Sequence, residues 1–226
     1  MKLTNPIVVC CASFVAASFF ASTASAQSIT NGSLTGLPTV SSPPAPWYNW
    51  QFTPDTVDSL GPFNNTITPW TASPDGGTFV RGNGSVFVDS EAFAQVVTGL
   101  TIGQAYSVNV FQTNLGLELP SVGSWLGEDG YWSLVVDGSL EDSTSVISKQ
   151  AFASDAIIWS ADSLNFTATS TSHELAFVSR SVQPNGITAY MGIDGLRLQP
   201  VPTPGAVSLL AAGGLVAARR KRTRTA

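Results

Sequence analysis

The residues between Gln27 and Pro200 follow a pattern that restricts this part of the chain to a β fold. Short runs rich in Val, Ile, Phe, Thr and Ser end at Gly, Asn, Asp or Pro, as strands end at turns. No long window carries an apolar stripe with the spacing of a helix. We therefore predict about ten strands, at 47–52, 78–80, 85–88, 92–98, 105–114, 131–136, 157–160, 164–169, 174–179 and 189–198.

The clearest alternation lies in the segment 105–114. Apolar and aromatic residues share one face of this predicted strand: Tyr106, Val108 and Val110. Together with the segment 92–98 and the short link 100–104, it predicts an antiparallel hairpin. Strands of this number and spacing fit an all-β, two-sheet antiparallel sandwich of jelly-roll type. A closed barrel is the alternative, and the irregular loop lengths favour the sandwich.

Residues 1–26 have the features of a secretory signal peptide. Lys2 provides a positive start, an apolar stretch follows at 7–20, and a small-residue cleavage site ends at Ala26. Both cysteines of the chain lie inside the apolar stretch. The exported chain therefore has no cysteine, so packing or a bound ion has to hold it in place of disulfides.

Residues 201–226 form a second targeting segment, in which a proline-bearing motif precedes an apolar run at 205–218 and a basic cluster at 219–224. The run has about 14 residues, fewer than the roughly 20 of a usual membrane span, so a C-terminal helix docked on the domain is the alternative. Because basic residues stay on the cytoplasmic side, the preceding domain would lie outside. The motif and the cluster are Val201, Pro202, Thr203, Pro204, Arg219, Arg220, Lys221 and Arg222.

This tail resembles the PEP-CTERM sorting signal of bacteria that export surface polymers, which has a Val-Pro-Glu-Pro motif, an apolar stretch and an arginine cluster. Thr203 stands where that family has glutamate. The resemblance implies an exosortase-type processing enzyme as a partner and a transient membrane anchor before processing. It also implies a final location at the cell surface or outside the cell.

The charge balance limits the partners of the exported domain. The chain has 15 acidic and 10 basic residues, and all the acidic residues lie between positions 27 and 200. Few basic residues lie there, and they are scattered: Arg81, Lys149, Arg180 and Arg197. A domain without a basic stripe is a poor partner for nucleic acid or for an anionic membrane surface. Neutral sugars and cations fit this domain better.

The residue types needed for catalysis are sparse. His173 is the single histidine, so no two-histidine zinc site can form, and no Gly-x-Ser-x-Gly elbow is present to pair with it. We expect this histidine at the surface or in a turn. Glu118, Glu128 and Asp129 lie in or beside the long loop 115–130, and two carboxylates suffice for glycoside hydrolysis. Acidic residues in a Gly- and Ser-rich loop are commonly turn formers, so we predict a protein without enzymatic activity.

Aromatic residues in loops give the stronger functional lead. Trp125 lies in the long loop, which also carries Glu128 and leads into Tyr131, while Trp70 follows a proline. An indole offers a flat face to a sugar ring and an N–H to a hydroxyl, and long loops on a rigid sandwich often hold ligands. We predict that these four residues contact a carbohydrate. Other tryptophans are expected in the core: Trp47, Trp132 and Trp159.

Several landmarks follow in order along the exported segment: 29–33, 47–50, 100–106, 132–138, 165–170 and 192–198. This series resembles galactose-binding-like β-sandwiches, a group that includes carbohydrate-binding modules. The resemblance implies a structural calcium ion between the first and last strands, for which Asn31 and Asp194 are the candidates by position. Each of them also precedes a glycine, as in an ordinary turn.

These observations predict an exported, surface-directed β-sandwich that binds a polysaccharide or takes part in the extracellular polymer matrix. A structural matrix protein without a discrete ligand is the first alternative. A small polysaccharide-acting enzyme that uses Glu118 or Glu128 is the second.

Overall fold

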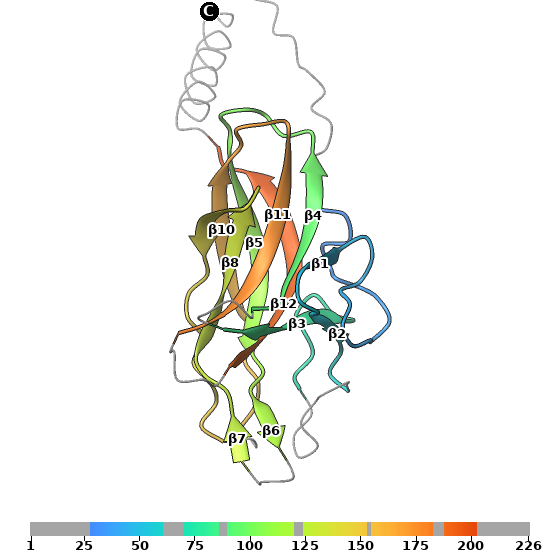
Figure 1. The fold of residues 1–226 in the computed structure, drawn as a ribbon, viewed down its shortest axis with the longest axis vertical. Coiled ribbons are helices and arrows are strands. Elements are labelled where there is room, and N and C mark those ends of the chain that lie inside the picture. Colours follow the sequence, from blue (N-terminus) through green and yellow to red (C-terminus); the bar gives the residue numbers. More distant parts are fainter. Residues whose placement is uncertain are drawn as a thin grey trace, which may run out of the picture.

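The computed structural model describes residues 28–60, 70–85, 90–119, 124–152, 155–182 and 188–202, without the side chains of 117–119 and 124–126. Every regular element in these residues is a β-strand (Figure 1). Within them, no helix is long and apolar enough to cross a membrane. The strands are β1 (Tyr48–Gln51), β2 (Asp55–Val57), β3 (Phe79–Gly84), β4 (Ala92–Thr98), β5 (Ala105–Asn114), β6 (Leu117–Leu119), β7 (Ser124–Leu126), β8 (Gly130–Val136), β9 (Ser139–Ser143), β10 (Ser160–Thr167), β11 (Ser172–Ser181) and β12 (Ala189–Pro200).

The strands form two five-stranded antiparallel sheets that pack face to face. The first sheet has the order β1-β4-β11-β8-β9, and the second sheet has the order β10-β5-β12-β3-β2. β6 and β7 pair with each other as a short hairpin at the lower end of the view in Figure 1. The predicted all-β, two-sheet antiparallel sandwich is therefore confirmed.

The core between the sheets is built from one face of each strand. Phe177 of β11 and Trp132 of β8 enter it from the first sheet and Tyr106 of β5 from the second, and all three are fully buried. Phe93 stacks on Phe177 with ring centroids 5.6 Å apart. A side chain at Gly82 would meet the Trp132 ring at 2.8 Å, so this glycine makes room for the indole. Burying each such aromatic side chain contributes about 1.5–3 kcal/mol.

The predicted hairpin between 92–98 and 105–114 is wrong, although both segments are strands with the predicted bounds. β4 belongs to the first sheet and β5 to the second, so the link 99–104 carries the chain from one sheet to the other. Leu100 of this link is buried in the core, where the turn of a hairpin would leave it exposed. The alternation predicted for 105–114 is confirmed, because its apolar face lies in the core.

Four short strands lie outside the predicted set: β2, β6, β7 and β9. β9 follows β8 through the turn Asp137-Gly138, whose φ angles of 48° and 84° fit a two-residue type I′ hairpin. β3 ends at Gly84, so the strand predicted at 85–88 is not found at its first residue, and its other residues lie outside the described part. β10 begins at Ser160, so the strand predicted at 157–160 is wrong except for its last residue.

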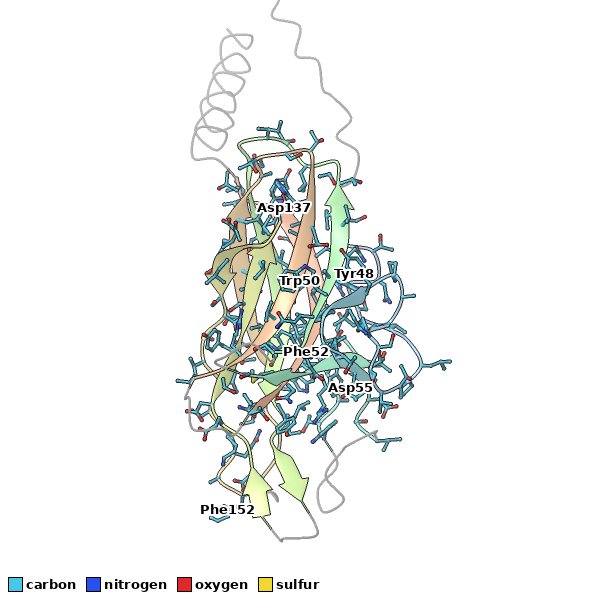
Figure 2. The ribbon with its side chains drawn as sticks, in the orientation of Figure 1. Tyr48, Trp50, Phe52, Asp55, Asp137 and Phe152 are labelled. Atoms are coloured by element: carbon cyan, nitrogen blue, oxygen red, sulfur yellow. The ribbon has the colours of Figure 1, made fainter. Side chains whose placement is uncertain are left out.

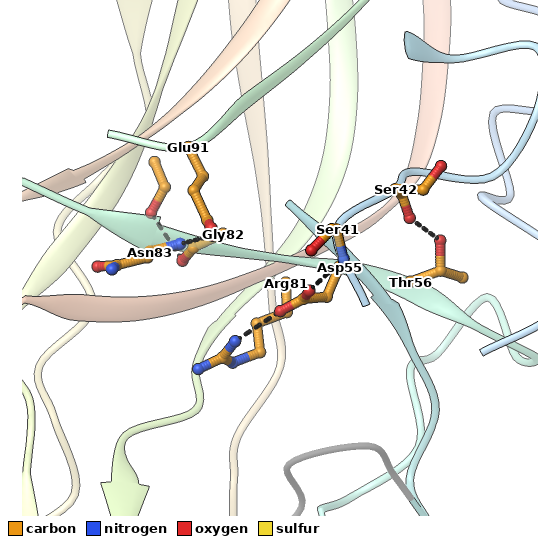
Figure 3. A network of polar contacts seen from close by, with 9 residues as sticks. Ser41, Ser42, Asp55, Thr56, Arg81, Gly82, Asn83 and Glu91 are labelled. Carbon is orange, nitrogen blue, oxygen red and sulfur yellow. Dashed lines mark hydrogen bonds and ion pairs between the residues drawn. The ribbon is translucent and has the colours of Figure 1, made fainter. Parts of the chain in front are cut away.

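Polar contacts hold the proline-rich segment 37–46 against β2 and β3. Asp55 accepts a hydrogen bond from the Ser41 amide at 2.8 Å and forms a buried ion pair with Arg81 at 2.7 Å (Figure 3). Thr56 Oγ1 donates to the carbonyl of Ser42 at 2.7 Å. These contacts attach a segment without regular structure of its own to the edge of the second sheet.

The predicted targeting segments fall almost wholly outside the described residues. Neither residues 1–26 nor the tail beyond Pro202 are among them. The Val201 amide donates to the carbonyl of Ala105 at 2.8 Å, and Gln104 Nε2 donates to the carbonyl of Val201 at 2.7 Å. The chain therefore leaves the sandwich beside the start of β5.

Candidate ligand-binding surface

Three aromatic side chains occupy alternate positions on the edge strand β1 and just beyond its end. They are Tyr48, Trp50 and Phe52, and we call them the β1 aromatic stripe. Tyr48 and Trp50 are alternate residues of β1, although the pairing with β4 shifts register between Asn49 and Gln51, and Phe52 follows the strand with a positive φ of 52°. Tyr48 is 39% exposed and Phe52 is 51% exposed, while Trp50 is half-buried in front of the first sheet (Figure 2). The outer face of the first sheet therefore displays aromatic surface to solvent.

The direction of the stripe is set by Trp47, which precedes it. Trp47 is buried against Phe93, with ring centroids 5.0 Å apart, and its Nε1–H donates to the carbonyl of Asn31 at 2.9 Å. Because side chains alternate along a strand, the inward position of Trp47 turns Tyr48 and Trp50 outward. The expectation that Trp47 belongs to the core is confirmed.

Glu174 of β11 joins two members of the stripe. The Tyr48 hydroxyl donates to Glu174 Oε2, and the Trp50 Nε1–H donates to Oε1 at 2.7 Å. Burial raises the pKa of Tyr48 to about 12, and the hydrogen bond to Glu174 and its charge add to this shift. The phenol therefore stays protonated as a donor. Each oxygen of Glu174 has more than one acceptor site, so it can also accept from a ligand hydroxyl.

A buried histidine fixes the end of β11 that carries Glu174. His173 is 3% exposed, and its Nε2 accepts hydrogen bonds from the amides of Thr169 and Ser170, both at 3.0 Å. Nδ1 therefore carries the proton and donates to Asp137 Oδ2 at 2.6 Å. The amide of Glu174 and then His173 lower the pKa of Asp137. The histidine expected at the surface or in a turn is thus buried, and its ring holds the turn before β11.

Small side chains lie beneath the stripe. Outer-face residues of β4, β8 and β11 form an apolar cluster against which Trp50 packs: Ala92, Ala94, Val135, Ala176 and Val178. Alanine at three of these positions leaves room for an indole to lie over the strands. The cluster supports Trp50 from the sheet side, while Tyr48 and Phe52 extend into solvent.

The outer face of the second sheet has the opposite arrangement. Phe79 of β3 and Tyr190 of β12 alternate with core residues and point away from the core, but side chains from loops cover them: Trp70, Ile157 and Trp159. Phe79 contacts the edge of Trp159 at 5.0 Å between centroids. Trp70 is 4% exposed, so the ligand contact predicted for it is corrected to a packing role. Trp159, expected in the core between the sheets, packs in this outer cluster.

The other predicted ligand residues are spread over the molecule. Tyr131 lies on the outer face of the first sheet, opposite Arg180 of β11, and is half-buried. The carbonyl of Glu128 accepts a hydrogen bond from Asn114 Nδ2 at 2.8 Å. Trp125 belongs to β7, and its side chain lies outside those described. Of these residues, Tyr131 shares a sheet face with the stripe.

The two residues predicted to hold calcium differ in their surroundings. The side chain of Asn31 accepts from the Thr35 amide and donates to the carbonyls of Thr35 and Ala45, so it holds the turn that opens the domain. Asp194 of β12 is fully buried, and neither of its carboxylate oxygens has a hydrogen bond of normal geometry among the described residues. Burial raises the pKa of Asp194 to about 7. A calcium site here would need a partner for Asp194 other than Asn31.

Sequence reasoning placed the ligand on the loops and missed the stripe. The alternate aromatic positions 48, 50 and 52 were visible in the sequence. The acceptor Glu174 was not, because it lies 124 positions from Trp50 and is brought beside it by the pairing of β4 with both β1 and β11.

Comparison with known proteins gives the fold alone. No protein-family model and no curated protein matches the chain. Among solved structures, the C-terminal domain of EclA, a sugar-binding protein, is 24% identical over 47% of this chain and 64% of its own, with a TM-score of 0.32. The stig cyclase FisC from Fischerella sp. TAU is 13% identical over 75% of this chain and 90% of its own, with a TM-score of 0.50. The FisC likeness supports the sandwich and says nothing of the ligand.

Proposed function

We propose that this protein is an exported, non-enzymatic carbohydrate-binding protein whose ligand lies on the β1 aromatic stripe. The observation that carries the proposal is the exposure of Tyr48 on β1 and of Phe52 just after it, beside a carboxylate, Glu174, that orients the Tyr48 and Trp50 rings. Single exposed apolar residues are normal on protein surfaces, whereas here Tyr48, Trp50 and Phe52 lie close together in the chain, and two of them share Glu174 as an acceptor.

The stripe offers the two kinds of contact that a sugar ring uses. The negative face of an aromatic ring attracts the polarised C–H groups on one face of a pyranose. Glu174 and the Tyr48 oxygen can accept hydrogen bonds from hydroxyl groups around the ring. The stripe lies on an open sheet face, which suits an extended polysaccharide better than a small enclosed ligand.

Charge favours a neutral glycan. The chain has 15 acidic residues, all of them in the exported segment, against four basic residues there. An anionic polymer would be repelled by this domain, while a neutral polysaccharide would not. The ligand class that we assign is therefore a neutral polysaccharide, and nucleic acid is excluded from the proposal.

The setting of this function is the bacterial cell surface. We assign residues 1–26 as a signal peptide and 201–226 as a PEP-CTERM-like sorting tail cut by an exosortase-type enzyme near Pro202. The apolar segments and the basic cluster after position 218 support this assignment. We also place the domain among galactose-binding-like jelly rolls, which its two five-stranded sheets support. Intact-mass analysis of the exported protein should give a chain that ends near Pro202, and a retained basic tail would contradict the assignment.

A structural role without ligand is the second candidate, and one observation favours it. The hydrogen bonds from Tyr48 and Trp50 to Glu174 also tie the edge strand β1 to β11 across β4.

Phe52 separates these candidates, because it follows β1 and its side chain has no polar group that could bond to Glu174. The test is retention of the purified protein on insoluble neutral polysaccharides such as cellulose, chitin and xylan. We expect Phe52→Ala to weaken binding about tenfold, equivalent to ~1.4 kcal/mol. Phe152→Ala is the matched control, because Phe152 is 68% exposed at the lower end of the molecule in Figure 2, away from the stripe. A wild-type protein that binds no neutral polysaccharide would overturn the proposal and favour the structural role.

A further inference from the structure

The edge strands β9 and β10 meet on one side of the sandwich, and we call their contact the β9–β10 seam. β9 ends the first sheet and β10 ends the second, and the two strands contact each other. Within the described strands, neither is a hydrogen-bonded neighbour of the other. Each strand therefore has one side whose backbone groups are not paired within its own sheet.

A carboxylate takes the place of backbone pairing in the seam. Asp142 Oδ1 accepts a hydrogen bond from the Ser143 amide of β9 at 2.8 Å, and Asp142 Oδ2 accepts from the Asn165 amide of β10 at 2.7 Å. Asn165 Nδ2 donates to the same oxygen at 3.1 Å. One side chain thus binds a backbone amide from each of the two sheets.

Both of these amides point away from the sheet to which their strand belongs. Successive amides of an antiparallel strand point to opposite sides. The Thr144 amide donates to the carbonyl of Trp132 in β8 at 2.9 Å, so the amide before it, that of Ser143, points outward. The Asn165 amide reaches β9 and not β5, so it also points outward. These are the groups that an added strand would use.

A second carboxylate, Asp162 of β10, fixes the other half of the seam. Its Oδ1 accepts from the Ser163 amide at 2.7 Å, and its Oδ2 accepts from the amide of Ser145, which follows β9, also at 2.7 Å. Burial opposes the charged form, but the hydrogen bonds from Ser145, Ser163 and Gln112 outweigh it and lower the pKa of Asp162. The first half of β10 is therefore attached to the chain after β9, and the second half depends on Asp142.

β10 is the better of the two edges for adding a strand. It has eight residues and pairs with β5 without a shift in register, whereas β9 has five residues and shifts register against β8. Long, regular edge strands are the ones that most readily pair with another chain. An antiparallel strand can pair with its own copy across a two-fold axis, so a second copy of this chain is the partner that β10 suits.

We propose that Asp142 keeps this protein monomeric by occupying the outward side of β10, and that β10 pairs with β10 of a second copy once this side chain is removed. An incoming strand has to displace a carboxylate that binds both the backbone and the side chain of Asn165. Charged side chains on edge strands are a common protection against such pairing. This inference concerns self-association and does not depend on the proposed carbohydrate function.

The test is the oligomeric state of the purified protein, measured by sedimentation velocity over a dilution series. Wild type should sediment as a monomer. Asp142→Ala should form a two-fold dimer, with about a twofold rise in weight-average mass at high concentration that reverses on dilution. Glu141→Gln is the matched control, because Glu141 is an exposed acidic residue next to Asp142 and its substitution removes the same charge. This variant should stay monomeric.

Two further variants show whether the association uses β10. Asn165→Pro, added to Asp142→Ala, removes the outward amide and should restore the monomer, because proline is tolerated on edge strands where its position needs no sheet hydrogen bond. Asp142→Asn keeps the side-chain shape and one acceptor oxygen, so it should stay folded by circular dichroism and give the same dimer at higher concentration.

Three results would overturn the proposal. The first is a folded Asp142→Asn protein that stays monomeric at every concentration, together with a monomeric Asp142→Ala. The second is a double variant that associates as strongly as Asp142→Ala, since the association would then not use the outward side of β10. The third is association of Glu141→Gln or of the wild type, since net charge or another surface would then control it.

Discussion

The outer faces of the two sheets carry similar aromatic residues, which are buried on the second sheet and exposed on the first. On the second sheet, Phe79 is fully buried beneath Trp70 and other loop side chains. On the first sheet, Phe52 is 51% exposed and Tyr48 is 39% exposed. The two faces carry the same residue types, and they differ in exposure because loop side chains cover the aromatic residues of the second sheet. Aromatic content therefore does not identify a binding face until the path of the loops is known.

The support beneath the two sets of rings differs as well. The covered face has a second apolar cluster, and a buried ion pair between Asp55 and Arg81 adjoins it, with Arg81 4.7 Å from the centre of the Tyr190 ring. The open face has small alanine side chains beneath Trp50 and a carboxylate at its edge. The covered face is built for stability, and we interpret the open face as built for contact with a ligand.

The largest expected difference between the faces concerns two phenylalanines. Phe79→Ala should lower the free energy of unfolding by about 3–5 kcal/mol, because it opens a cavity in the covered cluster. Phe52→Ala should change it by less than about 0.5 kcal/mol, as exposed substitutions usually do. Urea denaturation of both variants measures this. Similar losses in the two would contradict the distinction between the faces.

The next effect concerns the ion pair beside the covered face. Asp55→Asn should lower the free energy of unfolding by about 3 kcal/mol, because it removes the carboxylate that forms a buried ion pair with Arg81. The double variant Asp55→Asn/Arg81→Met should recover part of this loss. The comparison on the open face is Glu174→Gln, which should cost less than about 1 kcal/mol. Equal losses for the two single acidic substitutions would show that both faces are equally buried in solution.

Stability should depend on pH through Glu91, whose carboxyl group accepts a hydrogen bond from the Asn83 amide. Burial raises its pKa to about 7, and the nearby charge of Asp55 adds to this, against the Asn83 amide and Arg81. A folded-state pKa above the ordinary value of 4.5 means that the folded state holds the proton more tightly. The contribution of Glu91 to stability should therefore be fully present below about pH 4.5 and be lost as pH rises to about 7.

Glu91→Gln tests this effect, because its amide oxygen can still accept the Asn83 N–H. At pH 8 the variant should be more stable than wild type by about 1–3 kcal/mol, and below pH 4.5 the two should be equal. Urea denaturation at pH 4.5 and pH 8 gives the comparison. Asp194 should affect both proteins alike, so parallel pH profiles would contradict the assignment to Glu91.

The smallest expected effect lies on the open face. Tyr48→Phe removes one hydrogen bond to Glu174 and keeps the ring, so it should cost about 0.5–1 kcal/mol of stability. In the wild-type protein, titration of the Tyr48 phenol near pH 12, followed by ultraviolet absorbance, would confirm the burial that raises the pKa of Tyr48. A titration near pH 10 would show that Tyr48 is free of Glu174 in solution.

The strands that sequence reasoning located best are those with long apolar alternation. The bounds of β4 and β5 were predicted from this pattern alone, but their pairing was not, because a turn of six residues serves a hairpin and a sheet-to-sheet link equally well. The buried position of Leu100 is what decides between them. β9 was missed although the Asp137-Gly138 pair before it is a typical hairpin signal.

The candidate site was harder to predict than the fold, since it depends on contacts between distant segments. Asp194 was predicted as a calcium ligand from its position in the sequence, and Ser73 and Asp75, which act on its carboxyl group in the structure, come from a turn more than a hundred positions earlier. Trp70 and Phe52 look alike in the sequence as aromatic residues next to turns. Only the packing of 70–77 over β12 separates the covered residue from the exposed one.

The most direct test of the central claim is hydroxyl-radical footprinting of the wild-type protein with and without a bound neutral polysaccharide. In the free protein, Tyr48 and Phe52 should be oxidised readily, while Trp70 and Phe79 should be protected by burial. Binding should protect Tyr48, Trp50 and Phe52 and leave the oxidation of Phe152 unchanged. Binding that leaves the stripe as reactive as before, or that protects another surface, would contradict the account.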